Sequence, residues 1–164
     1  MRLMLVGGEA NEPGYVRELR KMICAANVEI GGRCGRHAIE WIGALSQERI
    51  AMMLNAADLF GLASSSEGWC NAVAESLACG CPVVATDVGG NAEVLGGAQN
   101  GLLTPLGDSA ALCRAIVEGL QCDWNRAAIA EFGQARTWAK AGRDSVSAIE
   151  SACERHAGRA RRSA

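Results

Sequence analysis

Residues 58–90 read DLFGLASSSEGWCNAVAESLACGCPVVATDVGG. Two apolar runs, 58–63 and 82–86, are each followed by a loop rich in serine or glycine, and both runs predict buried β-strands. The residues between them, 71–79, predict a short helix that ends at Gly80. A strand, a helix and a second strand in this order indicate two parallel strands joined by a crossover helix.

The same alternation extends from this stretch toward both ends of the chain. Apolar runs predict further strands at 2–6, 38–42 and 101–104. Helical periodicity predicts a helix at 14–26 and another of about ten residues that begins after Ser46. Because the strands are apolar throughout, we predict an α/β fold with a Rossmann-like parallel sheet and helices on both faces.

The length and composition bound the remaining possibilities. The 164 residues are 49% hydrophobic, which is the size of one ordinary domain with a sizeable core. From Asp108 onward the pattern is helical, and we expect Gly133 and Gly142 to separate two or three helices. We therefore predict a single domain over 1–164, in which 123–164 form a helical C-terminal segment.

Charge and targeting signals exclude several classes of protein. With 16 basic and 18 acidic residues the net charge is −2, which disfavours a dedicated nucleic-acid binder. No apolar stretch approaches the roughly 18 to 20 residues of a membrane span. The first ten residues lack the apolar segment and cleavage site of a signal peptide. We expect a cytoplasmic protein.

The eight cysteines agree with that location. They form no Cys-x-x-Cys pair, and neither His37 nor His156 stands at zinc-site spacing from a cysteine pair. We favour buried or half-buried reduced thiols over a metal site or disulfides.

The loop at 64–70 and the helix after it carry the features of an anion-binding site. A helix N-terminus has a partial positive charge and several free N–H groups. Gly68 allows an anion to approach the backbone closely, and Asn71 is expected to cap the helix. This pattern is typical of a site for a diphosphate.

Two glutamates flank this candidate site. Glu75 would lie about 6 Å further along the helix axis, near the distance from a diphosphate to an attached ribose, and a carboxylate accepts hydrogen bonds from a vicinal diol. Glu67 lies on the other side, where a sugar joined to the phosphate would be. By spacing alone, however, a solvated loop residue and a solvated helix residue are the favoured interpretation.

The wider pattern resembles a known family. Glu67 and Glu75, eight positions apart, match the E-x(7)-E element of the family 4 retaining glycosyltransferases, which have the GT-B fold. Residues 57–103 resemble the donor-binding, C-terminal half of these enzymes, and a weaker resemblance extends over 3–164. The matching segments follow in the family's order: Ala57-Asp58, Ser66-Glu67-Gly68, Ala78-Cys79-Gly80, Pro82-Val83-Val84-Ala85-Thr86, Val88-Gly89-Gly90, Glu93-Val94 and Asn100-Gly101-Leu102-Leu103.

The resemblance implies a role for each matching residue. The substrate would be a nucleoside-diphosphate-sugar, transferred to an acceptor hydroxyl without a metal or another cofactor. Glu67 would be the catalytic residue that binds and orients the donor sugar, and Glu75 would hold the ribose. Backbone N–H groups would bind the sugar and phosphates, and a second loop would lie near the base: Gly68, Trp69, Cys70 and Asn71 for the first, Gly43, Ala44 and Leu45 for the second.

The chain also departs from the family pattern. The Arg and Lys that grip the diphosphate in the family precede the first strand, as does the N-terminal acceptor-binding half. We therefore expect a C-terminal domain that is inactive alone and whose partner is that missing N-terminal acceptor domain. Arg33 and Arg36 could substitute for the missing cations, but a solvated surface role is favoured. Trp69, Cys70 and Ala92 stand where Phe, Gly or Pro, and Pro are common in the family.

Other interpretations remain open at this point. A non-catalytic nucleotide-binding or interaction module derived from the domain is the main alternative, and an epimerase or a dehydrogenase is disfavoured by the motif spacing. The basic cluster at 155–162 is compatible with peripheral membrane association of the full enzyme, although a solvated terminus is favoured. Trp124 and Trp138 are expected to be packing residues.

Overall fold

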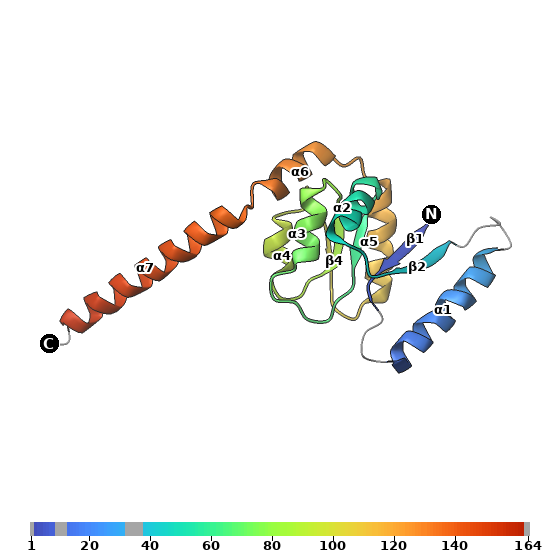
Figure 1. The fold of residues 1–164 in the computed structure, drawn as a ribbon, viewed down its shortest axis with the longest axis horizontal. Helices are drawn as coiled ribbons and strands as arrows, with labels where there is room; N and C mark the ends of the chain where they lie inside the picture. The colour runs from blue at the N-terminus through green and yellow to red at the C-terminus, as the bar shows by residue number, and fades with distance from the viewer. Residues whose placement is uncertain (1, 9–12, 32–37, 163–164) are drawn as a thin grey trace. The chain divides into compact units, whose positions relative to one another are not determined.

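The computed structural model describes residues 2–8, 13–31 and 38–162 (Figure 1). The chain divides into two compact units, residues 1–52 and 53–164. The α/β class is confirmed, because parallel sheets flanked by helices are present in both units. That 1–164 forms a single domain stays a prediction.

The first unit contains a two-stranded parallel sheet. Its elements are β1 (Leu3–Val6), α1 (Pro13–Gly31) and β2 (Ile39–Gly43), followed by the start of α2 (Gln47–Ala56). Asn27 of α1 fixes the start of β2, because its amide nitrogen donates to the Ile39 carbonyl at 2.8 Å and its oxygen accepts from two N–H groups. The Ser46 hydroxyl accepts from the Arg49 N–H at 3.5 Å, so the predicted cap of α2 is confirmed.

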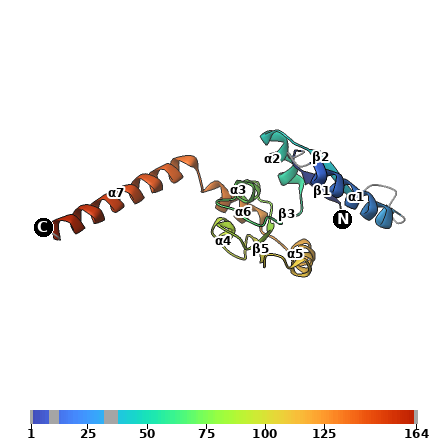
Figure 2. The ribbon, with the colours of Figure 1, turned by 90° about the horizontal axis from the view of Figure 1, so that it is seen from below.

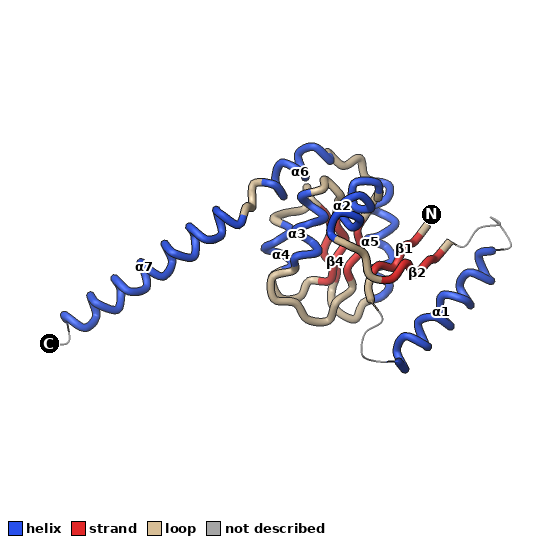
Figure 3. The backbone as a smooth tube through the Cα atoms, in the orientation of Figure 1, coloured by secondary structure: helices blue, strands red, loops and turns tan. Residues whose placement is uncertain are grey.

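The second unit contains a three-stranded parallel sheet in the order β3–β4–β5. Figure 3 shows its central strand β4 in red, next to the blue helices of the unit. Phe60 pairs with Val83, and Val83 pairs with Gly101. The central strand is buried at every residue, as the unbroken apolar run predicts. The elements of this unit are β3 (Phe60–Leu62), α3 (Asn71–Ala78), β4 (Val83–Thr86), α4 (Asn91–Leu95), β5 (Gly101–Thr104), α5 (Ser109–Gln121), α6 (Arg126–Gln134) and α7 (Trp138–Arg162).

Helices cover both faces of this second sheet. Figure 2 shows β5 between α4 and α5, and Figure 1 shows β4 between the same helices. Alternate residues of β4 point to opposite faces. Val83 and Ala85 belong to the core that also contains Val73 of α3 and Ile129 of α6, whereas Val84 faces α5. This packing fixes α3, which begins at the candidate site.

The expected helix breaks at Gly133 and Gly142 were wrong. Gly133 lies inside α6 and Gly142 inside α7, and the breaks fall at 122–125 and 135–137 instead. A Cβ on Gly133 would overlap the backbone of α3, so this glycine serves helix packing. The break before α6 is marked by Asn125, whose side chain accepts from the Ala128 N–H at 3.0 Å. Helix α1 also extends beyond the predicted 14–26.

The cysteines differ in part from the sequence prediction. All seven described cysteines are free thiols, but four of them are exposed: Cys24, Cys113, Cys122 and Cys153. Cys34 lies outside the described residues. Burial raises the pKa of the Cys81 thiol. Trp124 packs against the core and donates to the Gly119 carbonyl, as expected of a packing residue, whereas the side chain of Trp138 lies outside the described part.

No helix within the described residues has both the length and the apolar character needed to cross a bilayer.

Candidate functional site

The candidate site of the second unit lies at the carboxyl ends of β3 and β4, where ligands bind in parallel α/β sheets. Two loops meet there: the 64–70 loop, between β3 and α3, and the 87–90 loop, between β4 and α4. The Thr86 hydroxyl donates to the Ser64 carbonyl at 2.6 Å, and the Gly90 N–H donates to the Gly68 carbonyl at 2.8 Å. These bonds hold the two loops together.

Two glycines allow this close approach. Gly89 has φ +53°, and a Cβ there would overlap the backbone of Glu67. A Cβ on Gly90 would lie 2.6 Å from the Gly68 carbonyl oxygen, well inside ordinary contact distance. The 87–90 loop therefore supports the backbone of the 64–70 loop directly.

Helix α3 begins at the end of the 64–70 loop without a side-chain cap. The N-cap residue is Cys70, with φ −80° and ψ 102°, and no side chain accepts from the first turn. The predicted cap by Asn71 was wrong, because Asn71 already occupies the first helical position. In a helix, the N–H groups of residues 71–73 have no acceptor in the preceding turn. The start of α3 thus offers hydrogen-bond donors and a positive dipole end to an anion.

The two glutamates lie in this second unit as separate carboxylates. Glu67 is half-buried in the 64–70 loop, and Glu75 is exposed on the second turn of α3. No hydrogen bond or ion pair inside the described part of the chain engages either carboxylate. Both carboxylates remain free to accept hydrogen bonds from the hydroxyl groups of a ligand. One turn beyond Glu75, the pKa of Cys79 is raised by burial and by the charge of Glu75.

Trp69 lies in the same loop and is 48% exposed. The guanidinium of Arg136 stacks over its ring, 4.9 Å from the ring centre. Cys70, by contrast, is buried and belongs to the core of the unit. The buried side chain of Cys70 therefore anchors the 64–70 loop in the core.

Buried polar side chains lie behind the loop, and sequence reasoning missed them. Asn91, fully buried, donates to the Thr86 carbonyl at 2.9 Å, whereas its own side-chain oxygen and the Ser64 hydroxyl have no partner in the described chain. An asparagine directly after two glycines at a strand end was the available signal. Arg136 offered none, because its contact with Trp69 joins residues far apart in the sequence.

The residues expected near the base belong to the first unit. Gly43 ends β2 with φ +85°, and its carbonyl accepts from the Gly7 N–H at 3.0 Å. Ala44 and Leu45 follow it in the loop before α2. Their place beside a nucleobase stays a prediction, because Gly43, Ala44 and Leu45 belong to a different unit from the 64–70 loop. Arg33 and Arg36 lie outside the described residues.

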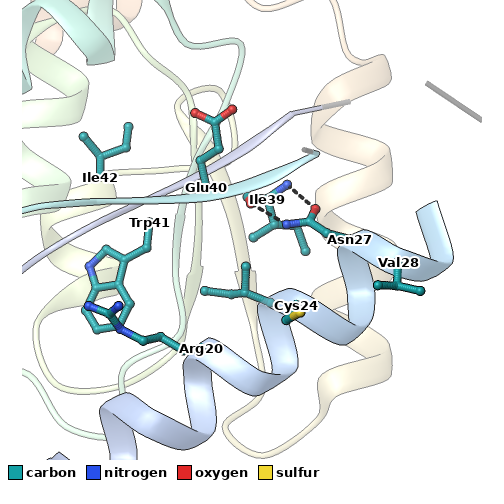
Figure 4. A pocket seen from close by; sticks show the side chains of 9 residues that line it. Arg20, Cys24, Asn27, Val28, Ile39, Glu40, Trp41 and Ile42 are labelled. Carbon is teal, nitrogen blue, oxygen red and sulfur yellow. Dashed lines mark hydrogen bonds between the residues drawn. The ribbon is translucent and has the colours of Figure 1, made fainter. Parts of the chain in front are cut away.

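The first unit also has an open groove of about 620 Å³ between α1 and β2 (Figure 4). It is mostly apolar, and Arg20 stacks over Trp41 at one end, 5.4 Å from the ring centre. Neither Gly43 nor the loop after it lines this groove. It contains no arrangement of carboxylates and free backbone donors like that at α3. Among the described residues, no group of three His, Cys, Asp or Glu side chains could hold a metal ion.

Comparison with known proteins places these features in a family. Residues 1–122 match the family model described as "Glycosyl transferases group 1". A D-inositol 3-phosphate glycosyltransferase from Xylanimonas cellulosilytica is 32% identical over 136 residues, which are 82% of this chain and 31% of that protein. The chain thus spans about a third of the length of this curated relative.

Two solved structures are similar to this chain. Anabaena HepE in complex with UDP-glucose has 29% identity and a TM-score of 0.65, covering 82% of this chain and 35% of that one. The sucrose-phosphate synthase of Thermosynechococcus elongatus has 26% identity and a TM-score of 0.63, covering 80% of this chain and 31% of that one.

Proposed function

Because the chain belongs to the group 1 glycosyl transferases, which have the GT-B type of fold, we propose that it is the C-terminal, donor-binding domain of a family 4 retaining enzyme. The donor is a nucleoside-diphosphate-sugar, and the UDP-glucose bound to the similar HepE supports a uridine nucleotide. The free thiols of all described cysteines support a cytoplasmic location.

One observation carries this proposal: the uncapped start of α3 follows Glu67 and precedes Glu75 in the chain, and the described residues engage neither carboxylate. The N–H groups of Gly68, Trp69, Cys70 and Asn71 receive the diphosphate and the sugar. Glu75 accepts the ribose hydroxyls from the second turn of α3. Glu67 accepts hydroxyls of the donor sugar from the half-buried part of the loop.

The chemistry follows from where charge develops during the transfer. When the bond between sugar and phosphate breaks, negative charge accumulates on the leaving diphosphate. The N–H groups and the dipole at the start of α3 are fixed before the reaction and stabilise that charge without reorganising. Glu67 orients the sugar so that the acceptor hydroxyl attacks from the productive face.

The acceptor, and the activity of the complete enzyme, belong to the same proposal. The described site supplies donors and carboxylates to the nucleotide-sugar but offers no acceptor-binding groups of its own. We therefore expect this chain alone to bind donor and to transfer little or no sugar. Transfer returns when a segment that supplies acceptor binding and further cations is present.

A thermal-shift titration tests the proposal. The chain is titrated with UDP, GDP, ADP and their sugar conjugates, beside Glu75→Ala and the control Glu118→Ala on the exposed face of α5. Ligand at about ten times its Kd stabilises by about 1.4 kcal/mol, which raises Tm by roughly 3 to 6 °C at this size. We expect a shift with one nucleotide that Glu75→Ala abolishes and Glu118→Ala keeps.

Two results would contradict the proposal in different ways. No shift with any nucleotide at millimolar concentration would remove the donor site from this chain. A shift with UDP that is the same for UDP-glucose, and unchanged in Glu67→Ala, would indicate a nucleotide-binding module that serves no sugar.

A further inference from the structure

Trp69 of the 64–70 loop is covered by an arginine that follows α6. The guanidinium carbon of Arg136 lies 4.9 Å from the centre of the Trp69 ring and 5.2 Å from the centre of the Phe132 ring. Trp69 is 48% exposed, and the arginine restrains the part of the ring that it covers. A planar guanidinium stacks well on such a ring.

The same guanidinium binds α4. The Nη2 atom of Arg136 donates to the Glu93 carbonyl at 3.0 Å. Glu93 lies near the end of the short helix α4, where carbonyl groups lack helical partners and a positive charge is favourable. Because α4 directly follows the 87–90 loop, Arg136 connects the Trp69 side chain to the helix that begins at the end of that supporting loop.

Helix α6 ends two residues before Arg136 and is itself held at both ends by hydrogen bonds. At its start, Arg126 donates to the carbonyls of Ala57 at 2.5 Å and Asn55 at 3.0 Å. At its end, Gln134 donates to the Ala78 carbonyl of α3 at 2.9 Å. Ile129 between them is 1% exposed and belongs to the core. Arg136 thus extends from a helix that is fixed against α3.

We propose that Arg136 is a positioning residue for the donor site, which holds the 64–70 loop in its donor-binding form by stacking on Trp69 while bound to α4. This inference rests on the proposed function, because the loop N–H groups that it positions are those assigned to the diphosphate and sugar. The role depends on the planar shape of the guanidinium and not on its charge alone.

Binding measurements on the full chain test the role. By calorimetry, Arg136→Ala weakens UDP-glucose binding roughly three- to tenfold, and Arg114→Ala on the exposed face of α5 changes nothing. Arg136→Lys weakens it as much as alanine does, because an ammonium group cannot stack flat on the indole. Wild-type affinity in Arg136→Lys would show that charge suffices and would overturn the proposal.

A second ligand separates positioning from general destabilisation. Uridine uses Glu75 and not the 64–70 loop, so its binding, followed by ligand-observed NMR, stays the same in Arg136→Ala. An equal loss for uridine and UDP-glucose would overturn the positioning role. In a double-mutant cycle, Trp69→Ala with Arg136→Ala weakens UDP-glucose binding no more than either change alone, because both remove the same contact.

A measurement without ligand keeps this test apart from that of the proposed function. Hydrogen exchange of the amides in the 64–70 loop becomes faster in Arg136→Ala and Arg136→Lys than in the wild type or Arg114→Ala. Unchanged exchange would overturn the contact as a positioning device. A third outcome is faster exchange in the two variants together with a wild-type chain that binds neither UDP-glucose nor uridine. That outcome would overturn the proposed function and the donor part of this inference, and it would leave Arg136 a purely structural role.

Discussion

Replacing Gly133 by alanine is expected to favour the helical conformation of α6 locally but to disturb the packing of α6 on α3. Gly133 lies inside α6, where alanine is favoured over glycine by about 1 kcal/mol. At this position, however, the new Cβ would overlap the backbone atoms of Leu77 and Ala78 in α3. Backbone atoms cannot turn away as a flexible side chain can, so α6 must move outward from α3.

The cost of that movement exceeds the gain. Overpacking costs typically about 1 to 3 kcal/mol. Ile129 and Phe132 lie on the same helix, and partial exposure of a fully buried Ile129 adds roughly 1 kcal/mol. After the helix gain of about 1 kcal/mol is subtracted, the expected net loss of unfolding free energy is about 2 kcal/mol. This corresponds to a Tm lower by roughly 4 to 8 °C.

Gly142→Ala is the matched control, because Gly142 also lies inside a helix and a Cβ there would meet nothing within 4 Å. It should leave stability unchanged or raise it by up to about 1 kcal/mol. The assay is urea unfolding followed by circular dichroism, with linear extrapolation for the wild type and both variants. If Gly133→Ala were as stable as Gly142→Ala, the close packing of α6 on α3 would be refuted.

Three further outcomes follow from individual contacts. Asn125→Ala removes the cap of α6 and should cost about 1 kcal/mol in urea unfolding, whereas Asn125→Ser should restore most of it. Gly89→Ala should cost more free energy of UDP-glucose binding, measured by calorimetry, than free energy of unfolding, because its Cβ displaces the backbone of Glu67. Normal binding would refute that contact. The negative charge of Glu75 helps to raise the pKa of Cys79, so Glu75→Gln should lower that pKa and speed alkylation of Cys79 at pH 8; equal rates, resolved by mass spectrometry of the labelled peptide, would contradict this.

Much of the second unit could be predicted because its signals are local. The unbroken apolar run before Thr86 indicates a strand buried on both faces, and Gly80, with φ +70°, ends α3 as a C-terminal glycine should. The carboxylate pair and the glycine loops are likewise visible in the order of the residues. Such features depend on neighbours in the chain, and sequence reasoning therefore places them within one or two residues.

The features that sequence reasoning missed depend on residues far apart in the chain. Gly133 and Gly142 are the same residue type in similar helical surroundings, and only the backbone of α3 distinguishes a packing glycine from an exposed one. Asn71 is the better cap by residue preference. The bond between Gly90 and Gly68 nevertheless fixes the loop, and α3 starts directly after Cys70. The contact of Arg136 with Trp69 exists only because α6 packs on α3.

The magnitudes at the start of α3 also decide which ligand class the site favours. Glu75 lies about 6 Å along the helix from its start, so its charge repels a phosphate charge by roughly 0.7 kcal/mol in water. The helix dipole attracts an anion by about 0.3 to 1 kcal/mol, and the two effects nearly cancel. Hydrogen bonds to a charged group contribute about 1.5 to 3 kcal/mol, and each carboxylate accepts two from a vicinal diol. A simple phosphate and a diphosphate both accept hydrogen bonds from the N–H groups at the start of α3. Under the proposed roles only a nucleotide-sugar also supplies hydroxyl groups to Glu67 and Glu75, which is why we propose that ligand class over a simple phosphate.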